Sequence, residues 1–287
     1  MKKLDHPVVV SGRVIAGDKL GRRLGFPTAN LRLSKVPLIK PGVYLAVCRL
    51  KKNSFLGLAY FGPQHNFEVY LFNFSAEIYN QILKVKLTHF IRSPQKITSK
   101  AALKKLIQTD LTKLDNLVIL VNHQDQPLGV LEKKSAHLGH GRLHRAISVQ
   151  LFNSKKELLI QQRSKTKMLF PLIWANTVCT DVRPYESYED AAHRRLNEEL
   201  GLKANLKPLT KFFYQAASGT AGSEKEIDQL FIGQTDQTPR PNPAEIQAIK
   251  YLSLFRLKKA INANPDQFTL WLKVILKKID PSDIFKS

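Results

Sequence analysis

Cysteine is scarce in this sequence: its 287 residues contain two, Cys48 and Cys179. Two cysteines exclude the dense disulfide framework of a small secreted protein and suit a reducing compartment. Long apolar runs are also missing, since no stretch approaches the roughly 18 consecutive apolar residues of a membrane-spanning helix. Lys2 and Lys3 have no apolar signal-peptide segment behind them. We therefore expect a cytoplasmic protein without a membrane partner.

Acidic residues are few as well. The chain has 23 Asp and Glu against 45 Lys and Arg, a formal net charge of +22, and residues 1–115 alone carry 20 basic and 6 acidic residues. Such a surface attracts the phosphates of nucleotides, diphosphates or nucleic acids, although a high charge also serves solubility. Because no Arg/Lys run is interleaved with aromatic residues, the sequence favours small phosphorylated ligands, and we expect no nucleic-acid partner.

The hydrophobic pattern divides the chain into two parts, as its length also predicts. Residues 8–90 contain short β-rich runs separated by Gly and Pro, which is typical of a small antiparallel barrel. Behind Ser99, a residue type that caps helices, the pattern becomes helical, and a new strand begins at Leu117. We predict an all-β barrel with a C-terminal helix over residues 1–114 and an α/β domain over residues 115–287.

The second part alternates strands with helices. Strands are expected at residues 146–153 and 157–162, and a helix at residues 188–200 that ends at Gly201. A last helix is expected over residues 267–278. This alternation predicts an α/β domain.

The densest motif of the first domain is Gly25-Phe-Pro-Thr-Ala-Asn30. An extended segment presents the side chains of Thr28 and Asn30 on one side, and such neutral oxygens suit Mg²⁺ carried by a nucleotide. Glu68 lies in a strand pattern, where a carboxylate could take a proton from an attacking hydroxyl. The alternative is structural, because Thr and Asn in turns usually bond their own backbone and a strand Glu is usually solvated.

Residues 8–112 resemble riboflavin kinase. The stretches that carry the resemblance are Ser11-Gly-Arg-Val-Ile15, Gly25-Phe-Pro-Thr-Ala-Asn30, Pro41-Gly-Val-Tyr44 and Phe67-Glu-Val-Tyr70. The resemblance implies that Thr28 and Asn30 bind Mg-ATP, and that Glu68 is the base acting on the ribityl hydroxyl of riboflavin. The sequence departs from the family pattern in the loop 62–67, at Asn80 and after Arg92. A degenerate barrel that binds flavin or nucleotide is therefore the alternative to an active kinase.

In the second domain, two residue pairs have the spacing of metal ligands. His137 and His144 are separated by a segment with two glycines, which favours a loop that can bring both imidazoles together. Glu224 and Glu226 stand two residues apart and share one face of a strand. Each pair has a structural alternative, namely an incidental histidine pair and an exposed strand edge.

Three further features have both a functional and a structural interpretation. Glu199 lies at the end of the predicted helix 188–200, whose charged face could simply be solvated. Arg163 and Lys167 could clamp a diphosphate through a guanidinium fork and a point charge, but such cations are common in a basic chain. Cys179 is by default an inert buried thiol.

Together these features resemble type 1 isopentenyl-diphosphate isomerase, a Nudix protein, over residues 117–278. The motifs are Leu131-Glu-Lys-Lys-Ser-Ala-His137, Arg142-Leu-His-Arg-Ala146, Phe170-Pro-Leu-Ile-Trp174-Ala-Asn-Thr-Val-Cys179 and Arg194-Arg-Leu-Asn-Glu-Glu-Leu-Gly201. The resemblance implies a Nudix fold in which a mixed sheet lies between helices. It implies conversion of isopentenyl diphosphate to dimethylallyl diphosphate.

The same resemblance implies the roles of individual residues. A divalent metal (Mg²⁺, Mn²⁺ or Zn²⁺) is expected at His137, His144, Glu224 and Glu226. A second Mg²⁺ is expected at Glu199, and the diphosphate is expected at Lys133, Arg163, Lys167 and Arg195. Cys179 and Glu226 are expected to face each other across the isopentenyl carbons, with Tyr214 beside the acid. Moving a double bond requires an acid and a base in a pocket without water, because water would quench the carbocation.

Two positions depart from the isomerase pattern. Asp181 stands where the family has a histidine metal ligand, and an aspartate there shifts the preference toward harder ions such as Mg²⁺ and Mn²⁺. Asp266 stands where the family tryptophan is expected, so the aromatic face toward the carbocation is missing unless Phe268 or Trp271 replaces it.

The sequence therefore predicts an isopentenyl-diphosphate isomerase domain behind a riboflavin kinase-like barrel. One alternative is a Nudix hydrolase that cleaves a diphosphate compound with the same metals and water. The other is a flavin-, nucleotide- or RNA-binding protein with degenerate catalytic sites.

Overall fold

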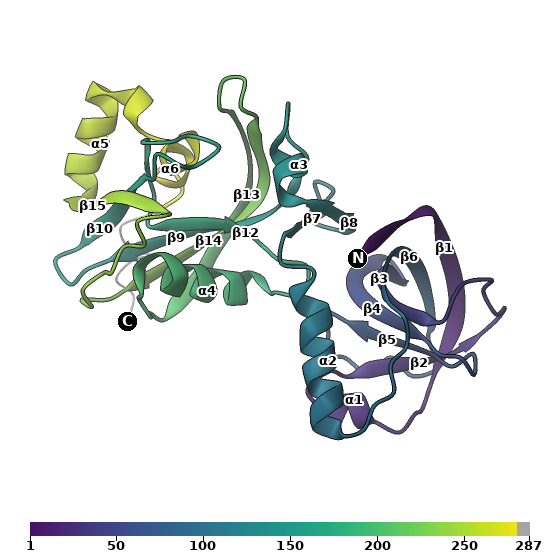
Figure 1. Ribbon diagram of the computed structural model, residues 1–287. Coiled ribbons are helices and arrows are strands. Elements are labelled where there is room, and N and C mark those ends of the chain that lie inside the picture. Colours follow the sequence, from purple (N-terminus) through teal and green to yellow (C-terminus); the bar gives the residue numbers. More distant parts are fainter. Residues whose placement is uncertain (280–287) are drawn as a thin grey trace. The chain divides into compact units, whose positions relative to one another are not determined.

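The computed structural model describes residues 1–279 and divides the chain into two compact units (Figure 1). The first unit contains Met1–Glu132 and Arg183–Glu186, and the second contains Lys133–Val182 and the chain from Ser187 onward. The expected boundary after residue 114 stays a prediction, because the compact units divide the chain at a different point. Residues 280–287 of the predicted second domain lie outside the described residues.

The first unit is β-rich, as predicted, and its strands close into an antiparallel barrel in the order β1-β2-β5-β4-β3-β6. Their bounds are β1 Lys2–Ile15, β2 Thr28–Leu33, β3 Gly42–Leu50, β4 Asn53–Phe61, β5 Phe67–Leu71 and β6 Ile82–Arg92. In β6, buried Leu83, Val85 and Leu87 alternate with exposed Ile82, Lys84 and Lys86, because successive side chains of a strand point to opposite faces. The apolar set fills the barrel interior.

Two helices and a hairpin complete the first unit. Helix α1 spans Leu20–Arg23, and α2 spans Lys100–Thr112, where the Ser99 hydroxyl accepts a hydrogen bond from the backbone N–H of Ala102 at 3.1 Å. Asp110 of α2 is buried against the Arg92 guanidinium at 2.9 Å, so an ion pair fastens the helix to the barrel. Strands β7 Leu117–Val121 and β8 Pro127–Glu132 pair as the hairpin.

The second unit is built on a mixed sheet, as predicted, with the strand order β11-β10-β9-β14-β13. Strands β9 and β14 run parallel, whereas β12 pairs with β9 and β15 with β10 in antiparallel fashion. The bounds are β9 His144–Phe152, β10 Glu157–Arg163, β11 Trp174–Ala175, β12 Val178–Asp181, β13 Leu206–Ala217, β14 Ser223–Gln234 and β15 Ile246–Ser253. The parallel pairing of β9 with β14 brings the beginnings of these two strands together, and the candidate site lies there.

Helices cover this sheet: α3 Lys133–His137, α4 Tyr188–Leu200, α5 Leu254–Ala263 and α6 Leu270–Ile275. Figure 1 shows α4 below the strands and α5 and α6 above them. Ser187 and Asp190 form a capping box at the start of α4, and Gly201 ends the helix with φ 63°. The last helix is shorter than the predicted 267–278, because Phe268 is extended and forms a β-bridge with Trp174.

No helix within residues 1–279 is long and apolar enough to cross a membrane.

Candidate active site

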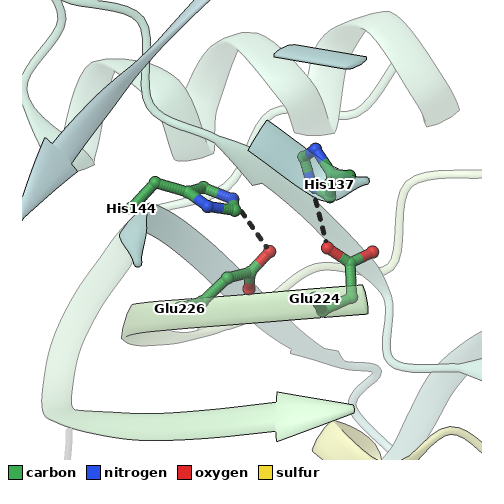
Figure 2. A group of neighbouring side chains, drawn as sticks. All are labelled: His137, His144, Glu224 and Glu226. Carbon is green, nitrogen blue, oxygen red and sulfur yellow. Dashed lines mark ion pairs between the residues drawn. The ribbon is translucent and has the colours of Figure 1, made fainter. Parts of the chain in front are cut away.

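Four side chains that the sequence proposes as metal ligands lie together in the second unit (Figure 2). One ligand atom from each of His137, His144, Glu224 and Glu226 lies within 4.8 Å of the others, and all four residues are buried. His137 ends α3, His144 begins β9, and the glutamates lie near the start of β14. The register of the parallel pair sets Glu226 directly beside His144.

The loop between the two histidines depends on glycine. Gly139 and Gly141 have φ values of 59° and 69°, in the left-handed region that glycine adopts without steric cost. A Cβ atom at Gly141 would lie 2.8 Å from the backbone oxygen of Ser223. The second glycine therefore allows the loop to pack against the start of β14, which brings the histidines to the glutamates.

Backbone carbonyls orient both imidazole rings. The Nδ1 atom of His137 lies 2.7 Å from the Lys133 carbonyl oxygen, and that of His144 lies 2.6 Å from the Arg142 carbonyl oxygen. With Nδ1–H as the donor, each Nε2 atom carries a lone pair, and His137 Nε2 lies 2.9 Å from Glu224 Oε2. A lone pair this close to a carboxylate oxygen requires a proton or a cation between them. The donor set therefore fits a divalent metal ion.

Asp181 joins this cluster through both of its oxygens. Oδ1 lies 2.9 Å from Nε2 of His144 and 3.6 Å from Nε2 of His137, while Oδ2 lies 2.7 Å from the Lys133 ammonium nitrogen. Burial alone would raise the pKa of Asp181, but Lys133 and His144 hold it well below its usual range. Asp181 therefore stays ionised, and Lys133 balances its charge.

The two glutamates differ in their protonation. Burial and the neighbouring Glu224 charge raise the pKa of Glu226 to about 7, whereas the hydrogen bond to His137 lowers the pKa of Glu224 despite burial. The Tyr214 hydroxyl donates a hydrogen bond of 2.5 Å to Oε2 of Glu226, since the two residues are directly opposite on β13 and β14. Glu226 is thus the carboxylate that can exchange a proton near neutral pH.

Cys179 lies on β12 two residues before Asp181. Burial raises the pKa of its thiol to about 12, although the nearby Arg163 charge opposes this. The charges of Glu199, Glu226 and Glu224 raise it further. Cys179 therefore carries its proton at neutral pH among the acidic groups of the site.

A group of aromatic rings, here called the aromatic wall, borders the site at Tyr214. The indole of Trp271 is fully buried, and its ring centroid lies 5.8 Å from that of Tyr214 and 5.2 Å from that of Phe170. Its Nε1–H donates to Oδ1 of Asn176 at 2.9 Å, which fixes the ring. The Arg163 guanidinium carbon lies 5.5 Å from the centre of the Trp271 ring. Replacement of the tryptophan expected at Asp266 by Trp271 or Phe268 stays a prediction.

The four cations expected to bind diphosphate all have acceptors within the protein. Arg163 donates to the carbonyl oxygens of Leu169 and Phe170 at 3.0–3.2 Å, and Lys133 pairs with Asp181. Lys167 and Arg195 both contact Oε2 of Glu245, and Arg195 also contacts Glu199.

Glu199 is buried on α4, where Nε2 of Gln161 donates to its second oxygen at 2.7 Å. It is not a member of the four-residue cluster. Its first oxygen contacts Arg195, one of the cations expected to bind the diphosphate.

The candidate residues of the barrel form a looser group. The Thr28 hydroxyl donates to Oε2 of Glu68 at 3.2 Å, and Asn30 is directly opposite Glu68 across β2 and β5. All three are half-buried. Of these three residues, Thr28 lines a cavity of about 380 Å³, together with Tyr79.

Comparison with known proteins finds a different family in each of the two parts of the chain. Residues 4–118 match the family model described as riboflavin kinase, and residues 142–272 match the model described as NUDIX domain. The isopentenyl-diphosphate Delta-isomerase of Pectobacterium atrosepticum is 39% identical over 171 residues, which is 59% of this chain and 95% of that protein. The isomerase of Nocardia farcinica is 40% identical over 164 residues, 57% of this chain and 94% of that protein.

The chain belongs to the isopentenyl-diphosphate Delta-isomerase family. Its isomerase-like part is a Nudix domain with a mixed sheet, and a riboflavin kinase-like domain precedes it. Among solved structures, the protein DR0079 of Deinococcus radiodurans is 26% identical with a TM-score of 0.49 and covers 57% of this chain and 99% of its own.

Two acidic residues of the isomerase domain, Asp228 and Glu245, were not predicted as site residues. Asp228 continues the alternation of Glu224 and Glu226 along β14, is fully buried, and accepts a hydrogen bond of 2.7 Å from the Ser148 hydroxyl. The spacing of two residues between Glu224, Glu226 and Asp228 could have identified it from the sequence. Glu245 gave no signal, because only the folded chain brings it to Lys167 and Arg195.

Proposed function

We propose that the isomerase domain converts isopentenyl diphosphate to dimethylallyl diphosphate. The observation that carries this proposal is geometric. Tyr214 donates a hydrogen bond of 2.5 Å to Glu226 and lies against Trp271, and the Cys179 side chain packs against the same apolar cluster. Hydrolysis of a diphosphate needs neither a thiol nor an aromatic wall. The names of the relatives that span this domain support the same substrate.

The reaction moves a double bond by one carbon. One of the two groups, Cys179 or Glu226, adds a proton to the terminal carbon, and the other removes a proton from the methylene on the far side of the branched carbon. No atom is gained or lost, so no co-substrate is needed. Tyr214 donates a hydrogen bond to Glu226 and holds that carboxyl in position.

The charge that develops on the branched carbon needs a dry and electron-rich surface. The ring of Trp271 contacts those of Tyr214 and Phe170, and the face of an aromatic ring stabilises a cation by roughly 0.5–2 kcal/mol. These rings also exclude the water that would otherwise trap the carbocation.

The metal ligands of the proposed enzyme are His137, His144, Glu224 and Glu226, with Asp181 as a fifth donor. A divalent ion there supplies a positive charge that neutralises these carboxylates and favours the ionised form of Glu226. Three carboxylates with two imidazoles form a hard donor set, which favours Mg²⁺ or Mn²⁺ over Zn²⁺. Glu199 is proposed to hold the second Mg²⁺ beside the diphosphate.

The diphosphate is proposed to bind at Lys133, Arg163, Lys167 and Arg195. Because each of these cations already has an acceptor, diphosphate binding is an exchange of partners. Glu245, which touches two of them, is the carboxylate that the diphosphate displaces.

The test is incubation of the purified whole protein with isopentenyl diphosphate and either Mg²⁺ or Mn²⁺. Formation of the allylic isomer, followed by proton NMR, supports the proposal. Release of inorganic phosphate or diphosphate without allylic product would instead identify a Nudix hydrolase.

We also propose that the barrel phosphorylates riboflavin with ATP. The contact between Thr28 and Glu68 beside a cavity of about 380 Å³ favours this second activity, because it sets a carboxylate base next to a residue proposed to bind Mg-nucleotide. FMN formation from riboflavin and ATP tests it. A barrel that binds flavin or nucleotide but forms no FMN would be the degenerate alternative.

A further inference from the structure

The outside of the barrel carries a continuous row of cations, here named the basic face. Six exposed residues form it: Arg32, Arg13, Lys84, Lys86, Arg49 and Lys51. They lie on β2, β1, β6 and β3 and on the turn after β3, and these four strands are neighbours in the barrel. At roughly 4.8 Å between strands, the basic face is about 15 Å wide.

The strand register sets like charges directly opposite each other on this face. Arg13 of β1 is opposite Arg32 of β2, and Lys84 of β6 is opposite Arg49 of β3. Like charges in such positions destabilise an antiparallel sheet. A polyanion lying across the strands would remove this repulsion.

Carboxylates do not balance these charges. Strands β2, β3 and β6 contain no acidic residue, and β1 contains only Asp5, eight residues before Arg13. Within residues 1–279, none of the six cations forms an ion pair with a carboxylate. The basic face is therefore a one-sign surface and not a salt-bridge network.

Backbone carbonyls hold two arginines of the basic face in place. Nη1 of Arg13 donates to the Asn80 oxygen at 2.7 Å, and Nε of Arg49 donates to the Lys51 oxygen at 3.3 Å. Each guanidinium keeps further N–H groups for an incoming phosphate. Beside them, a hollow of about 540 Å³ is lined by Arg49, Lys51 and Lys84 together with Gln81 and Ile82.

We propose that the basic face binds double-stranded nucleic acid through its phosphate backbone, without preference for base sequence. A row of six cations exceeds what one small diphosphate can neutralise, but it matches the regular charges along a duplex. Along β1 and β6 the outward neighbours of the cations are Val9, Ser11 and Ile82, so these two strands offer no aromatic ring on which the bases of a single strand could stack. The proposal replaces our expectation of no nucleic-acid partner.

The test measures the anisotropy of fluorescent RNA and DNA duplexes of about 20 base pairs with the whole protein between about 50 and 200 mM salt. The test variant is Arg13→Gln/Arg49→Gln/Lys84→Gln. The matched control is Lys104→Gln/Lys105→Gln/Lys155→Gln, which removes the same charge from exposed residues that are not members of the basic face. Thermal unfolding establishes that both variants are folded.

The proposal predicts that the test variant loses at least about tenfold in duplex affinity, and that the slope of log K against log salt flattens by about 2–3, because each phosphate contact contributes about 0.9. The control is predicted to bind RNA and DNA as the unchanged protein does. Equal losses in both variants, or no duplex binding at the lower salt, would overturn the proposal. Binding to phosphatidylserine vesicles without binding to duplex would assign the basic face to a membrane and would also overturn it.

Discussion

The two candidate catalytic sites of this chain differ in how completely the protein encloses their charges. In the isomerase domain, His144 and Asp181 are buried and lie 2.9 Å apart, and Lys133 pairs with the same aspartate. In the barrel, Glu68 is half-buried, and its contact with Thr28 measures 3.2 Å. Buried charges are costly unless they are paired or bind a metal. Removing one charge from the isomerase cluster would therefore leave its buried partner unpaired and destabilise the protein. Replacing Glu68 in the barrel should change stability little, because its carboxylate is only half-buried.

The two cysteines give the strongest test of this difference. Cys179→Ala is expected to lower isomerase turnover by roughly 10²–10⁴-fold, because it removes one of the two proton-transfer groups. Diphosphate affinity should stay near that of the unchanged protein, since the binding cations are intact. Allylic product and inhibition by inorganic diphosphate measure these two effects.

Cys48→Ala is the matched control, because Cys48 is buried inside the barrel. It should leave isomerase turnover unchanged. If Cys179→Ala keeps most of its isomerase turnover, Cys179 is not one of the two proton-transfer groups and the proposed proton transfer is wrong.

Metal binding should also distinguish the two units, and the expected change in affinity is smaller than the expected loss of turnover in Cys179→Ala. His144→Ala removes one donor from the cluster and is expected to weaken Mn²⁺ binding by at least about 10–100-fold, the loss typical of perturbing even the outer partners of a metal site. Titration calorimetry with Mn²⁺ alone measures this. In the barrel, Thr28→Ala should leave this Mn²⁺ affinity unchanged and weaken only Mg-nucleotide binding. An unaltered Mn²⁺ affinity in His144→Ala would place the metal elsewhere.

Asp181→His should change the preference for the metal more than its affinity. The substitution replaces a hard oxygen with an imidazole nitrogen and removes the partner of Lys133. We expect isomerase activity to be kept or raised, and the ratio of Zn²⁺ to Mg²⁺ affinity to increase. Competition titrations with the two metals test this, with Asp181→Asn as the variant that removes the charge alone. The same ratio in all three proteins would show that Asp181 is not a ligand.

Glu245→Gln is expected to give the smallest effect of these substitutions, a decrease in the thermal stability of the protein. The charges of Arg195 and Lys167 lower the pKa of Glu245 despite its partial burial. A lowered pKa in the folded state stabilises the protein above the unfolded pKa of about 4.3 and stops doing so as pH falls through the folded value. The Tm difference between the two proteins should therefore be largest near pH 7 and vanish at acidic pH. A constant difference across this range would contradict the ion-pair interpretation.

Local patterns predicted much of this fold. The helix at residues 188–200 was predicted with its true ends, and Gly201 was the stop signal in the sequence. The capping box of Ser187 and Asp190 marks its start, although the prediction did not use it. The last helix was predicted too long, since the β-bridge between Phe268 and Trp174 is a long-range contact that periodicity does not contain.

The site was less predictable than the fold. The residues that gather around the metal position were recognisable because their motifs are short and distinctive. Their partners were not: Lys133 meets Asp181, and Lys167 meets Glu245 across 78 positions of sequence. The basic face could not be recognised in the sequence either. Its residues lie on separate strands in which exposed and buried side chains alternate, so they form no continuous run of Arg and Lys.

The central claim is that the buried cluster of the isomerase domain performs isomerisation and not hydrolysis. Proton NMR of isopentenyl diphosphate incubated with the whole protein and Mg²⁺ in deuterated buffer tests it most directly. The account predicts dimethylallyl diphosphate carrying deuterium at a methyl group, with the diphosphate intact. Released phosphate, or unchanged isopentenyl diphosphate with either Mg²⁺ or Mn²⁺, would contradict it.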